Sequence, residues 1–214
     1  MAKRSIVLMN LGGPDSLEAI QPFLYNLFKD PAIIGLPTIL RLPLAKFIST
    51  RRAPVAREIY DHLGGRSPLL GLTKKQAAAL SAALTEQDSD HLYKVFISMR
   101  YWHPRSDETA SEVKAFDPDE ILLLPLYPQY STATSASSFI DWKKSAAKVG
   151  LIKPTYTLCC YPVDENWATA QSDLLHGQID TLKKEQKYRV LFSAHGLPKK
   201  IVDRGDPYQW QVER

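Results

Sequence analysis

The sequence has 214 residues, of which 44% are hydrophobic and 23% charged; this composition predicts a folded protein with a packed core and excludes wholesale disorder. The formal net charge is +4 and the basic residues are scattered in short pairs, so we expect no nucleic-acid partner. No apolar run reaches the roughly 18 residues of a membrane-spanning helix, and the first residues show no signal-peptide pattern.

Five short apolar runs predict strands, and helical patterns lie between them. The predicted strands cover residues 5–11, 93–99, 120–127, 154–158 and 188–193. The run at residues 120–127 is too uniformly apolar for a half-exposed strand, so it fits the centre of a parallel sheet. Strands and helices that alternate in this way predict an α/β fold, with helices on both faces of a parallel sheet.

The predicted helices begin at polar residues that can cap a helix N-terminus. They cover about residues 17–28, 73–84, 107–116, 131–148 and 166–185. Asp15 or Ser16 is expected to cap the first helix, and Thr73 is expected to cap the second, which is rich in alanine. Residues 150–154 are the best candidate for a domain boundary.

Residues 31–50 interrupt this alternation, because they are more apolar than an ordinary surface connection and contain Pro31, Pro37 and Pro43. Proline inside a helix removes a backbone hydrogen bond, so we expect that this segment is not one long core helix. One interpretation is a short helix packed on the sheet. The other is an apolar lip over a flat apolar ligand, with a further contact to a membrane surface.

Ligands of open parallel sheets bind beyond the carboxyl ends of the strands, so the segments that follow the predicted strands are candidate sites. Four such junctions contain unusual residues rather than generic turn formers: residues 10–14, 99–104, 124–131 and 192–198. The first contains Gly12 and Gly13 but lacks the G-x-G-x-x-G pattern, and the sequence has no Walker motif. These absences argue against a nucleotide site.

Arg100 and Tyr101 leave the second predicted strand together and have two interpretations. From spacing alone, an arginine that pairs with carboxylates inside the structure is the more frequent case. The alternative is an arginine and a flat aromatic ring that face a planar ligand. At the next junction Tyr130 precedes the hydroxyls of Ser131 and Thr132, and hydroxyls and free amides at a helix N-terminus attract anions such as carboxylates.

His195 follows an apolar run by two residues, and a neutral imidazole there can take up a proton or bind a metal. A lone histidine is more often structural. No two histidines have the i, i+4 spacing of a zinc helix, so a closed structural metal site is not expected. The two cysteines, Cys159 and Cys160, are adjacent and lack a C-x-x-C pattern, which predicts buried or idle thiols in a reducing compartment, the cytoplasm.

The motifs at these junctions resemble those of the ferrochelatase family. They are NLGGP at residues 10–14, R-R-x-P at 51–54, Tyr60 with GGRSP at 64–68, MRYWHP at 99–104, LPLYPQYS at 124–131, SAHGLP at 193–198 and RGDPY at 204–208. They follow the order of the family through essentially the whole chain. The combination of SAHGLP with PLYPQYS is highly specific.

The resemblance implies a lyase that inserts ferrous iron into a porphyrin, either protoporphyrin IX or coproporphyrin III, in the last steps of heme biosynthesis, with iron as substrate and no prosthetic group. It implies two Rossmann-like domains, residues 1–150 and an incomplete second domain at 151–214, with the porphyrin in a cleft between them. His195 matches the family's active-site histidine, as proton acceptor or iron ligand. Residues 31–50 match the family's apolar lip. The implied substrate-binding residues are Leu11, Arg52, Tyr60, Ser67, Arg100, Tyr101, Tyr130, Ser131 and Thr132.

The sequence also departs from the family, which is normally longer and whose later part supplies a glutamate opposite the histidine. Glu213 does not occupy the context of that glutamate, so we expect little chelatase activity from these residues alone. Two other functions stay open. One is a cobalt or sirohydrochlorin chelatase, although such relatives usually carry more histidines in the metal site. The other is a non-catalytic module that binds porphyrin.

Overall fold

The structure is a computed structural model that describes residues 1–183 and 186–214. The chain forms two compact units. The first consists of Met1–Leu126 and Thr132–Cys159, and the second of Tyr127–Ser131 and Cys160–Arg214. The two domains predicted at residues 1–150 and 151–214 remain a prediction; in the structure, residues 151–159 belong to the first unit because they carry a strand of its sheet.

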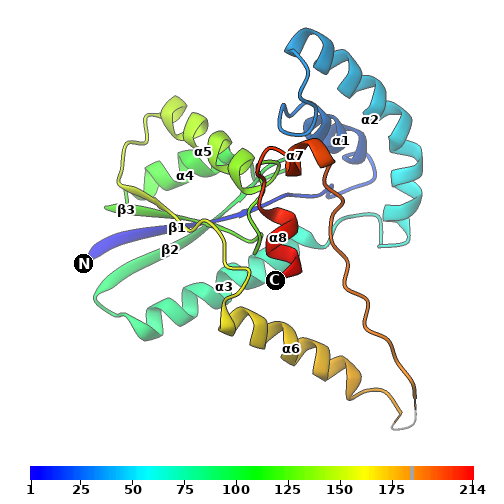
Figure 1. The fold of residues 1–214 in the computed structure, drawn as a ribbon. Coiled ribbons are helices and arrows are strands. Elements are labelled where there is room, and N and C mark those ends of the chain that lie inside the picture. Colours follow the sequence, from blue (N-terminus) through cyan, green and yellow to red (C-terminus); the bar gives the residue numbers. More distant parts are fainter. Residues whose placement is uncertain (184–185) are drawn as a thin grey trace. The chain divides into compact units, whose positions relative to one another are not determined.

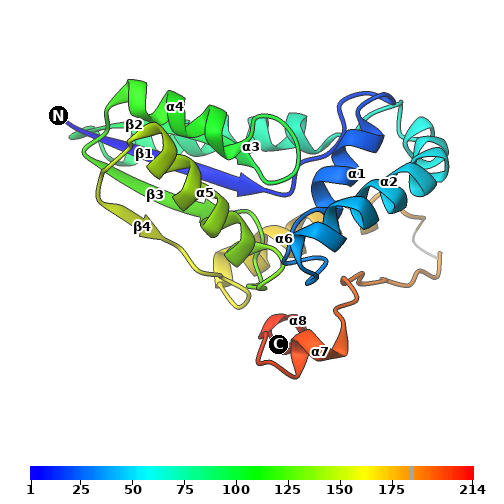
Figure 2. The same cartoon turned by 90° about the horizontal axis from the view of Figure 1, so that it is seen from above.

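The sheet of the first unit has four parallel strands in the order β2-β1-β3-β4 (Figures 1 and 2). Their bounds are Ala2–Asn10 for β1, His91–Met99 for β2, Glu120–Pro125 for β3 and Thr155–Thr157 for β4. Strand β1 is paired on both sides, so that Ile6 lies opposite Val95 of β2 and Leu122 of β3. The four strands predicted in this part of the chain are confirmed, as is the parallel α/β architecture.

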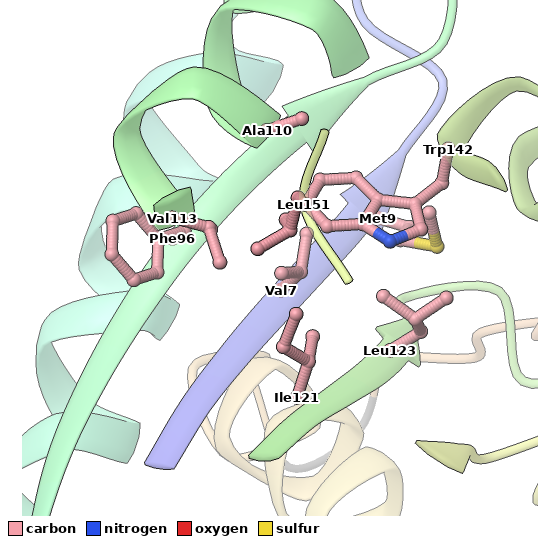
Figure 3. Close-up of a cluster of buried hydrophobic side chains, with 9 residues drawn as sticks. All are labelled: Val7, Met9, Phe96, Ala110, Val113, Ile121, Leu123, Trp142 and Leu151. Atoms are coloured by element: carbon pink, nitrogen blue, oxygen red, sulfur yellow. The ribbon is translucent and has the colours of Figure 1, made fainter. Parts of the chain in front are cut away.

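Helices cover both faces of this sheet. Helix α3 (Leu69–Gln87) packs on one face, where Ala77 contacts Ile6 and Leu8 of β1. Helices α4 (Ser106–Phe116) and α5 (Ser135–Val149) pack on the other face, over the core cluster in Figure 3. This cluster consists of Val7, Met9, Phe96, Ala110, Val113, Ile121, Leu123, Trp142 and Leu151. Because side chains alternate along a strand, β1 supplies both cores, and each large side chain buried there stabilises the fold by about 1.5–3 kcal/mol.

Helices α1 (Ile20–Phe28) and α2 (Thr38–Asp61) form a hairpin beyond the carboxyl ends of the strands (Figure 2). They pack chiefly on each other. The buried residues of α2 are all small, Ala45, Ser49 and Ala53, and they recur every fourth residue along one side of the helix. The Gln21 side-chain amide donates a hydrogen bond to the Ser49 hydroxyl at 3.0 Å, which ties α1 to α2.

The expectation that prolines interrupt residues 31–50 needs correction, because α2 continues through both Pro43 and Pro54. Each proline leaves one carbonyl of the preceding turn without its helical partner, that of Ile39 or that of Thr50. Both of those residues are exposed, so water can satisfy the free carbonyls. The segment is not a core helix, as expected, but neither is it a short helix packed on the sheet.

The predicted cap at Thr73 is also wrong, because α3 begins four residues earlier, at Leu69. The hydroxyl of Ser67 accepts a hydrogen bond from the Leu69 N–H at 3.2 Å and so satisfies one backbone donor at the start of the helix. Thr73 is buried inside the helix, where its hydroxyl accepts a hydrogen bond from the Asn10 amide at 3.2 Å. Thr73 therefore ties α3 to the end of β1.

The first helix starts later than predicted, at Ile20, although Ser16 does bind a backbone donor near it. The Ser16 hydroxyl accepts a hydrogen bond from the Ala19 N–H at 3.3 Å, one turn before α1 becomes regular. Helix α4 agrees with the prediction to one residue at its start, and α5 begins at Ser135, four residues after the predicted start at residue 131.

The second unit contains α6 (Glu165–Ile179), α7 (Lys199–Val202) and α8 (Tyr208–Glu213). The helix predicted at residues 166–185 forms as α6 but ends earlier, at Ile179, and its predicted last residue, Glu185, lies outside the described residues. The strand predicted at residues 188–193 is wrong: the segment has no regular structure, and Leu191 and Phe192 are 83% and 92% exposed. An apolar strand is stable only beside neighbouring strands, and the described part of this unit forms none. Among the helices of the described residues, we find none with the length and apolar character needed to cross a bilayer.

Candidate functional site

The carboxyl ends of β1, β2 and β3 lie at one edge of the sheet, and the loops that follow them are linked by backbone hydrogen bonds. The Tyr101 N–H donates to the carbonyl of Leu11 at 2.9 Å, and the Leu126 N–H donates to the carbonyl of Met9 at 2.8 Å. The chain enters β2 on one side of β1 and β3 on the other, so the strand order reverses at β1. Open α/β sheets bind their ligands at such a reversal. Leu11 therefore lies where this rule places a ligand.

The loop after β1 requires glycine because other residues approach it closely. Gly12 has a φ of +84°, and a Cβ there would lie 3.0 Å from the backbone nitrogen of Trp102. A Cβ on Gly13 would lie 2.5 Å from the Cβ of Ser67, which no side chain could tolerate. The Ser67 N–H also donates to the carbonyl of Pro14 at 2.8 Å. These contacts bring Ser67 next to the loop that contains Leu11.

A buried polar network surrounds Arg100. Its Nη2 lies 2.6 Å from Oδ2 of Asp30, its Nε donates to the Ser137 hydroxyl at 2.8 Å, and its Nη1 lies 3.4 Å from Oδ1 of Asp141. The hydroxyls of Tyr101 and Ser137 donate to the same Asp30 oxygen, at 2.8 and 2.6 Å. The side chains of Arg100 and Asp30 are only 14% and 3% exposed. Of the two interpretations of Arg100, pairing with carboxylates is the one present in the structure.

Tyr101 belongs to the same network and is 1% exposed. Its burial and the nearby charge of Asp30 hold the pKa of the Tyr101 phenol far above its ordinary value, so the hydroxyl stays protonated and acts as a donor. The Arg100 guanidinium lies 4.9 Å from the centre of its ring. Both side chains thus support the loops at the edge of the sheet, and a direct contact between either of them and a ligand stays a prediction.

The other predicted residues of the first unit are more accessible. Arg52 is exposed on α2, and Thr132 is exposed before α5. Tyr60 lies in the last turn of α2, where burial raises the pKa of its phenol. The described residues show no hydrogen bond that joins Arg52 or Tyr60 to Leu11. The structure therefore brings together Leu11, Ser67 and the Arg100–Tyr101 pair, and leaves Arg52 and Tyr60 on the helical hairpin.

In the second unit, Tyr130 and Ser131 bind residues near the end of the chain. The Ser131 hydroxyl donates to Oδ2 of Asp206 at 3.0 Å, and the Tyr130 N–H donates to the side-chain carbonyl of Gln211 at 2.7 Å. Asp206 and Gln211 are 7% and 8% exposed. The other oxygen of Asp206 accepts the Tyr208 N–H at 3.0 Å. Ser131 is thus engaged by a buried carboxylate, and this partner restricts the part it can take in anion binding.

His195 lies in the same unit, in an irregular segment, and its side chain is exposed. The backbone N–H of His195 donates a hydrogen bond to the Tyr208 hydroxyl at 3.1 Å. Through Tyr208 and Asp206 a chain of hydrogen bonds therefore runs from the backbone of His195 to Ser131. Residues 1–183 and 186–214 contain no group of three or more His, Cys, Asp or Glu side chains that could hold a metal ion. An exposed imidazole can exchange protons with water, and it can act as one ligand of an incoming metal ion.

Sequence reasoning missed several polar residues that the structure makes central. Asp30 lies between an apolar helix and Pro31 and belongs to no motif, although a single acid at such a boundary can indicate a turn. Asp206 lies in the RGDPY motif, which gives it no role of its own, and no sequence pattern singles out Gln211. Their importance depends on contacts between residues that lie 70 or more positions apart in the sequence.

Comparison with known proteins identifies the family of this sequence. The model of the Ferrochelatase family matches residues 3–214. The chain is 52% identical over 212 residues to a ferrochelatase of Pelagibacter ubique (strain HTCC1062) and 53% identical over 211 residues to one of Phenylobacterium zucineum (strain HLK1). Each alignment covers 99% of this chain and 61% of the relative. A third ferrochelatase, from a Wolbachia of Drosophila simulans, is 51% identical, with 67% of its length covered.

The chain thus spans about three fifths of the first two relatives. The family model nevertheless covers every loop at the carboxyl edge of the sheet, the hairpin of α1 and α2, and the segment that carries His195. A match of this extent, at about half identity to three proteins of one name, leads to a single assignment: the chain belongs to the ferrochelatase family.

Proposed function

We propose that this chain carries the first part of an enzyme that inserts ferrous iron into a porphyrin, protoporphyrin IX or coproporphyrin III, to make heme. The observation that carries the proposal is the family match over residues 3–214. Iron enters as a substrate, and the proposal requires no prosthetic group.

The first unit has side chains that suit a flat, apolar molecule with acidic edges. Residues 31–50, which we call the apolar lip, expose Ile39, Leu40 and Phe47, and these can cover a macrocycle face. Arg52 on α2 and the hydroxyl of Ser67 are of the chemical type that binds carboxylates. Charge-assisted hydrogen bonds of this kind contribute about 1.5–3 kcal/mol each. Leu11, at the end of β1, adds an aliphatic contact.

His195 supplies the acid–base chemistry in this proposal. Metal insertion removes two protons from the pyrrole nitrogens, and these protons need an acceptor. A neutral imidazole can accept one and release it to water, or it can bind the iron on its way to the ring. The exposed side chain of His195 and the hydrogen bond that its backbone N–H donates to Tyr208 are consistent with either role.

We also infer a reducing compartment, the cytoplasm, because Cys159 and Cys160 are adjacent in the sequence and lack the C-x-x-C spacing of a redox or zinc motif. The exposed side chains of the apolar lip, among them Ile39 at 81% exposure, provide a surface for peripheral contact with a membrane. Both inferences are open to direct test by fractionation of cells that produce the protein.

The function is tested with a chimera in which this chain is followed by the part of the Pelagibacter ubique relative that lies beyond the matched region. The chimera is mixed anaerobically with ferrous iron and with either porphyrin, and the absorbance of the metallated product is recorded. We expect insertion, and we expect His195→Ala to slow it by a factor of about 100 or more, because general acid–base groups contribute about that much. His176→Ala, in an exposed histidine of α6, is the matched control and should leave the rate unchanged.

Three outcomes would contradict the proposal. An insertion rate that is the same with and without His195 would remove the assigned catalytic role. A chimera that binds porphyrin but inserts no iron would favour a binding module. Tighter binding of sirohydrochlorin than of either porphyrin would favour the related chelatase class.

A further inference from the structure

We infer that Asp30 is a positioning residue: its carboxylate fixes the base of the apolar lip to the carboxyl edge of the sheet and so holds the lip ready for a flat ligand. The identity of that ligand rests on the proposed function. The mechanical role of Asp30 rests on contacts within the first unit alone.

The lip needs such an anchor because few apolar contacts hold it. Ile39 and Phe47 are 81% and 63% exposed, so they contribute little to packing. The buried positions of α2 are the small residues Ala45, Ser49 and Ala53, and they join α2 chiefly to α1. Small side chains bury little apolar area, and burial contributes roughly in proportion to area. Helix α2 therefore adds little apolar contact, and the placement of the hairpin depends on polar links together with the buried Ile20 and Phe23 of α1.

One side of the Asp30 carboxylate shapes the turn that starts the lip. Its Oδ1 accepts the Ala32 N–H at 2.8 Å, a local bond that closes a short turn. The Asp30 carbonyl accepts the N–H groups of Ile33 and Ile34 at 3.1 and 2.9 Å. Four consecutive residues after α1 are thus folded around this one side chain and its backbone.

The other side of the carboxylate binds the sheet layer. Oδ2 accepts hydrogen bonds from three donors: Arg100 Nη2 at 2.6 Å, the Tyr101 hydroxyl at 2.8 Å and the Ser137 hydroxyl at 2.6 Å. Arg100 and Tyr101 follow β2, and Ser137 lies in the first turn of α5. A single carboxylate therefore connects the base of the lip to two separate elements at the carboxyl edge.

Two further bonds reinforce this joint from neighbouring positions. The Asn26 amide of α1 donates to the Tyr101 carbonyl at 3.1 Å. Arg41, in the first turns of α2, donates to the carbonyl of Lys29 at 2.9 Å and also to the carbonyl of Leu36 and the hydroxyl of Thr38. Arg41 thus closes the loop between the two helices, whereas Asp30 connects that loop to the sheet.

The charge on Asp30 is maintained at neutral pH. Burial by itself would raise the pKa of this carboxyl, but the hydrogen bonds from Ser137 and Ala32 and the charge of Arg100 outweigh it, and the pKa lies below its ordinary value. The buried carboxylate is thus a permanent acceptor, and its replacement by an amide removes the charge with little change in shape.

The test compares Asp30→Asn with Asp141→Asn in the 214-residue chain, without porphyrin. Asp141 is the matched control because it also pairs with Arg100, and accepts from Ser106, but no bond connects it to residues 31–34 in the described part of the chain. Hydrogen exchange of peptides that cover residues 31–41 is measured beside that of peptides from β1. For Asp30→Asn we expect exchange in residues 31–41 to rise about tenfold more than exchange in β1, the change that the loss of one charge-assisted hydrogen bond produces locally, on top of any general loss of stability from the broken ion pair.

Tyr101→Phe provides a second, milder variant, because it removes one donor to Asp30 and keeps the ring. We expect exchange in residues 31–41 to rise for this variant as well, but by a smaller factor than for Asp30→Asn. Unchanged exchange in residues 31–41 for both variants would overturn the inference. An equal rise in residues 31–41 and in β1 would also overturn it, because that result indicates a general loss of stability.

A porphyrin titration then separates this inference from the proposed function. If the lip receives the porphyrin, Asp30→Asn should raise the Kd about tenfold and Asp141→Asn should leave it within twofold of the unmodified chain. A chain that binds no porphyrin at all would reject the proposed ligand, while the exchange result would still decide the role of Asp30. Normal affinity with a loosened lip would contradict the claim that the lip is held ready for the ligand.

Discussion

Two apolar runs of similar composition, residues 5–11 and 188–193, differ in structure and in exposure. Ile6, Leu8 and their neighbours form the centre of a sheet and are at most 5% exposed. Leu191 and Phe192, which follow a similar pattern, lie in an irregular segment and are more than 80% exposed. The first run has a paired strand on each side, whereas the described part of the second unit offers none.

The difference shows that an apolar run forms a strand only where neighbouring elements can cover it, so the run alone does not determine the structure. A strand is stabilised by cross-strand pairs and by helices that cover its side chains, and none of these is a property of the run itself. The second unit is instead organised by polar contacts, since the buried residues in its described part are Ser131, Asp206 and Gln211. Its motif residues are thus held by hydrogen bonds, and those of the first unit by a hydrophobic core as well.

The comparison is broken most directly by the same substitution at one leucine of each run. Leu8→Asp places a carboxylate between β1 and α3 without a partner, and we expect it to cost more than about 5 kcal/mol, enough to unfold the first unit. Leu191→Asp, in the exposed run, should change the free energy of unfolding by less than about 0.5 kcal/mol. Denaturation followed by circular dichroism measures both. Equal effects at the two positions would remove the distinction between the runs.

A second pair of variants sharpens the distinction between buried support and accessible binding residues. Arg100→Met leaves Asp30 buried without its ionic partner, and we expect a loss of about 3–5 kcal/mol in the free energy of unfolding. Arg52→Met, on the exposed side of α2, should leave stability within about 0.5 kcal/mol and should weaken porphyrin binding. A stable Arg100 variant together with an unfolded Arg52 variant would contradict this account, because Arg52 would then be the structural residue.

The smallest expected effect is a pH dependence confined to the first unit. The pKa of Asp30 is lowered by folding, so its contribution to stability is present above the ordinary aspartate pKa of about 3.9 and is lost as the pH falls through the lower folded value. The pKa of Tyr101 is raised by burial and by Asp30, so its contribution is present below about pH 10 and is lost at higher pH.

Unfolding curves at a series of pH values test this dependence. Tyr101→Phe should reduce the fall in stability above about pH 10 and leave the acid side nearly unchanged, apart from the lost hydrogen bond. Asp30→Asn should reduce the fall on the acid side. Profiles that coincide with that of the unmodified chain would show that these two groups do not set the pH limits of the first unit.

Much of the first unit could be predicted from the sequence because its elements follow local patterns. Strand β3 was predicted at residues 120–127 and forms at Glu120–Pro125, and α4 was predicted within one residue of its start. The prolines of α2 misled the prediction because the cost of a lost helical bond depends on exposure: water can bind the free carbonyls of Ile39 and Thr50.

The candidate site was less predictable, because its contacts join distant segments. The motifs indicated Arg100 and Tyr101, but the partner that buries them, Asp30, lies 70 residues earlier and has no motif of its own. Ser131 was predicted as an anion ligand, yet it donates to Asp206, 75 residues further along the chain. Sequence patterns identify residues whose side chains suit a given chemistry. Which hydrogen-bond partners those side chains have depends on the fold.

The central claim of the proposed function is that the carboxyl edge of the sheet and the apolar lip receive the porphyrin. The amino edge offers a rival hollow of about 330 Å³, lined by residues that include Arg4, Tyr93 and Glu120. Hydrogen exchange of the 214-residue chain with and without porphyrin decides between them. We predict protection of residues 10–14, 31–41 and 99–104 on binding, with residues 88–93 unchanged. Protection at residues 88–93 instead, or none at the three segments of the carboxyl edge, would contradict the account.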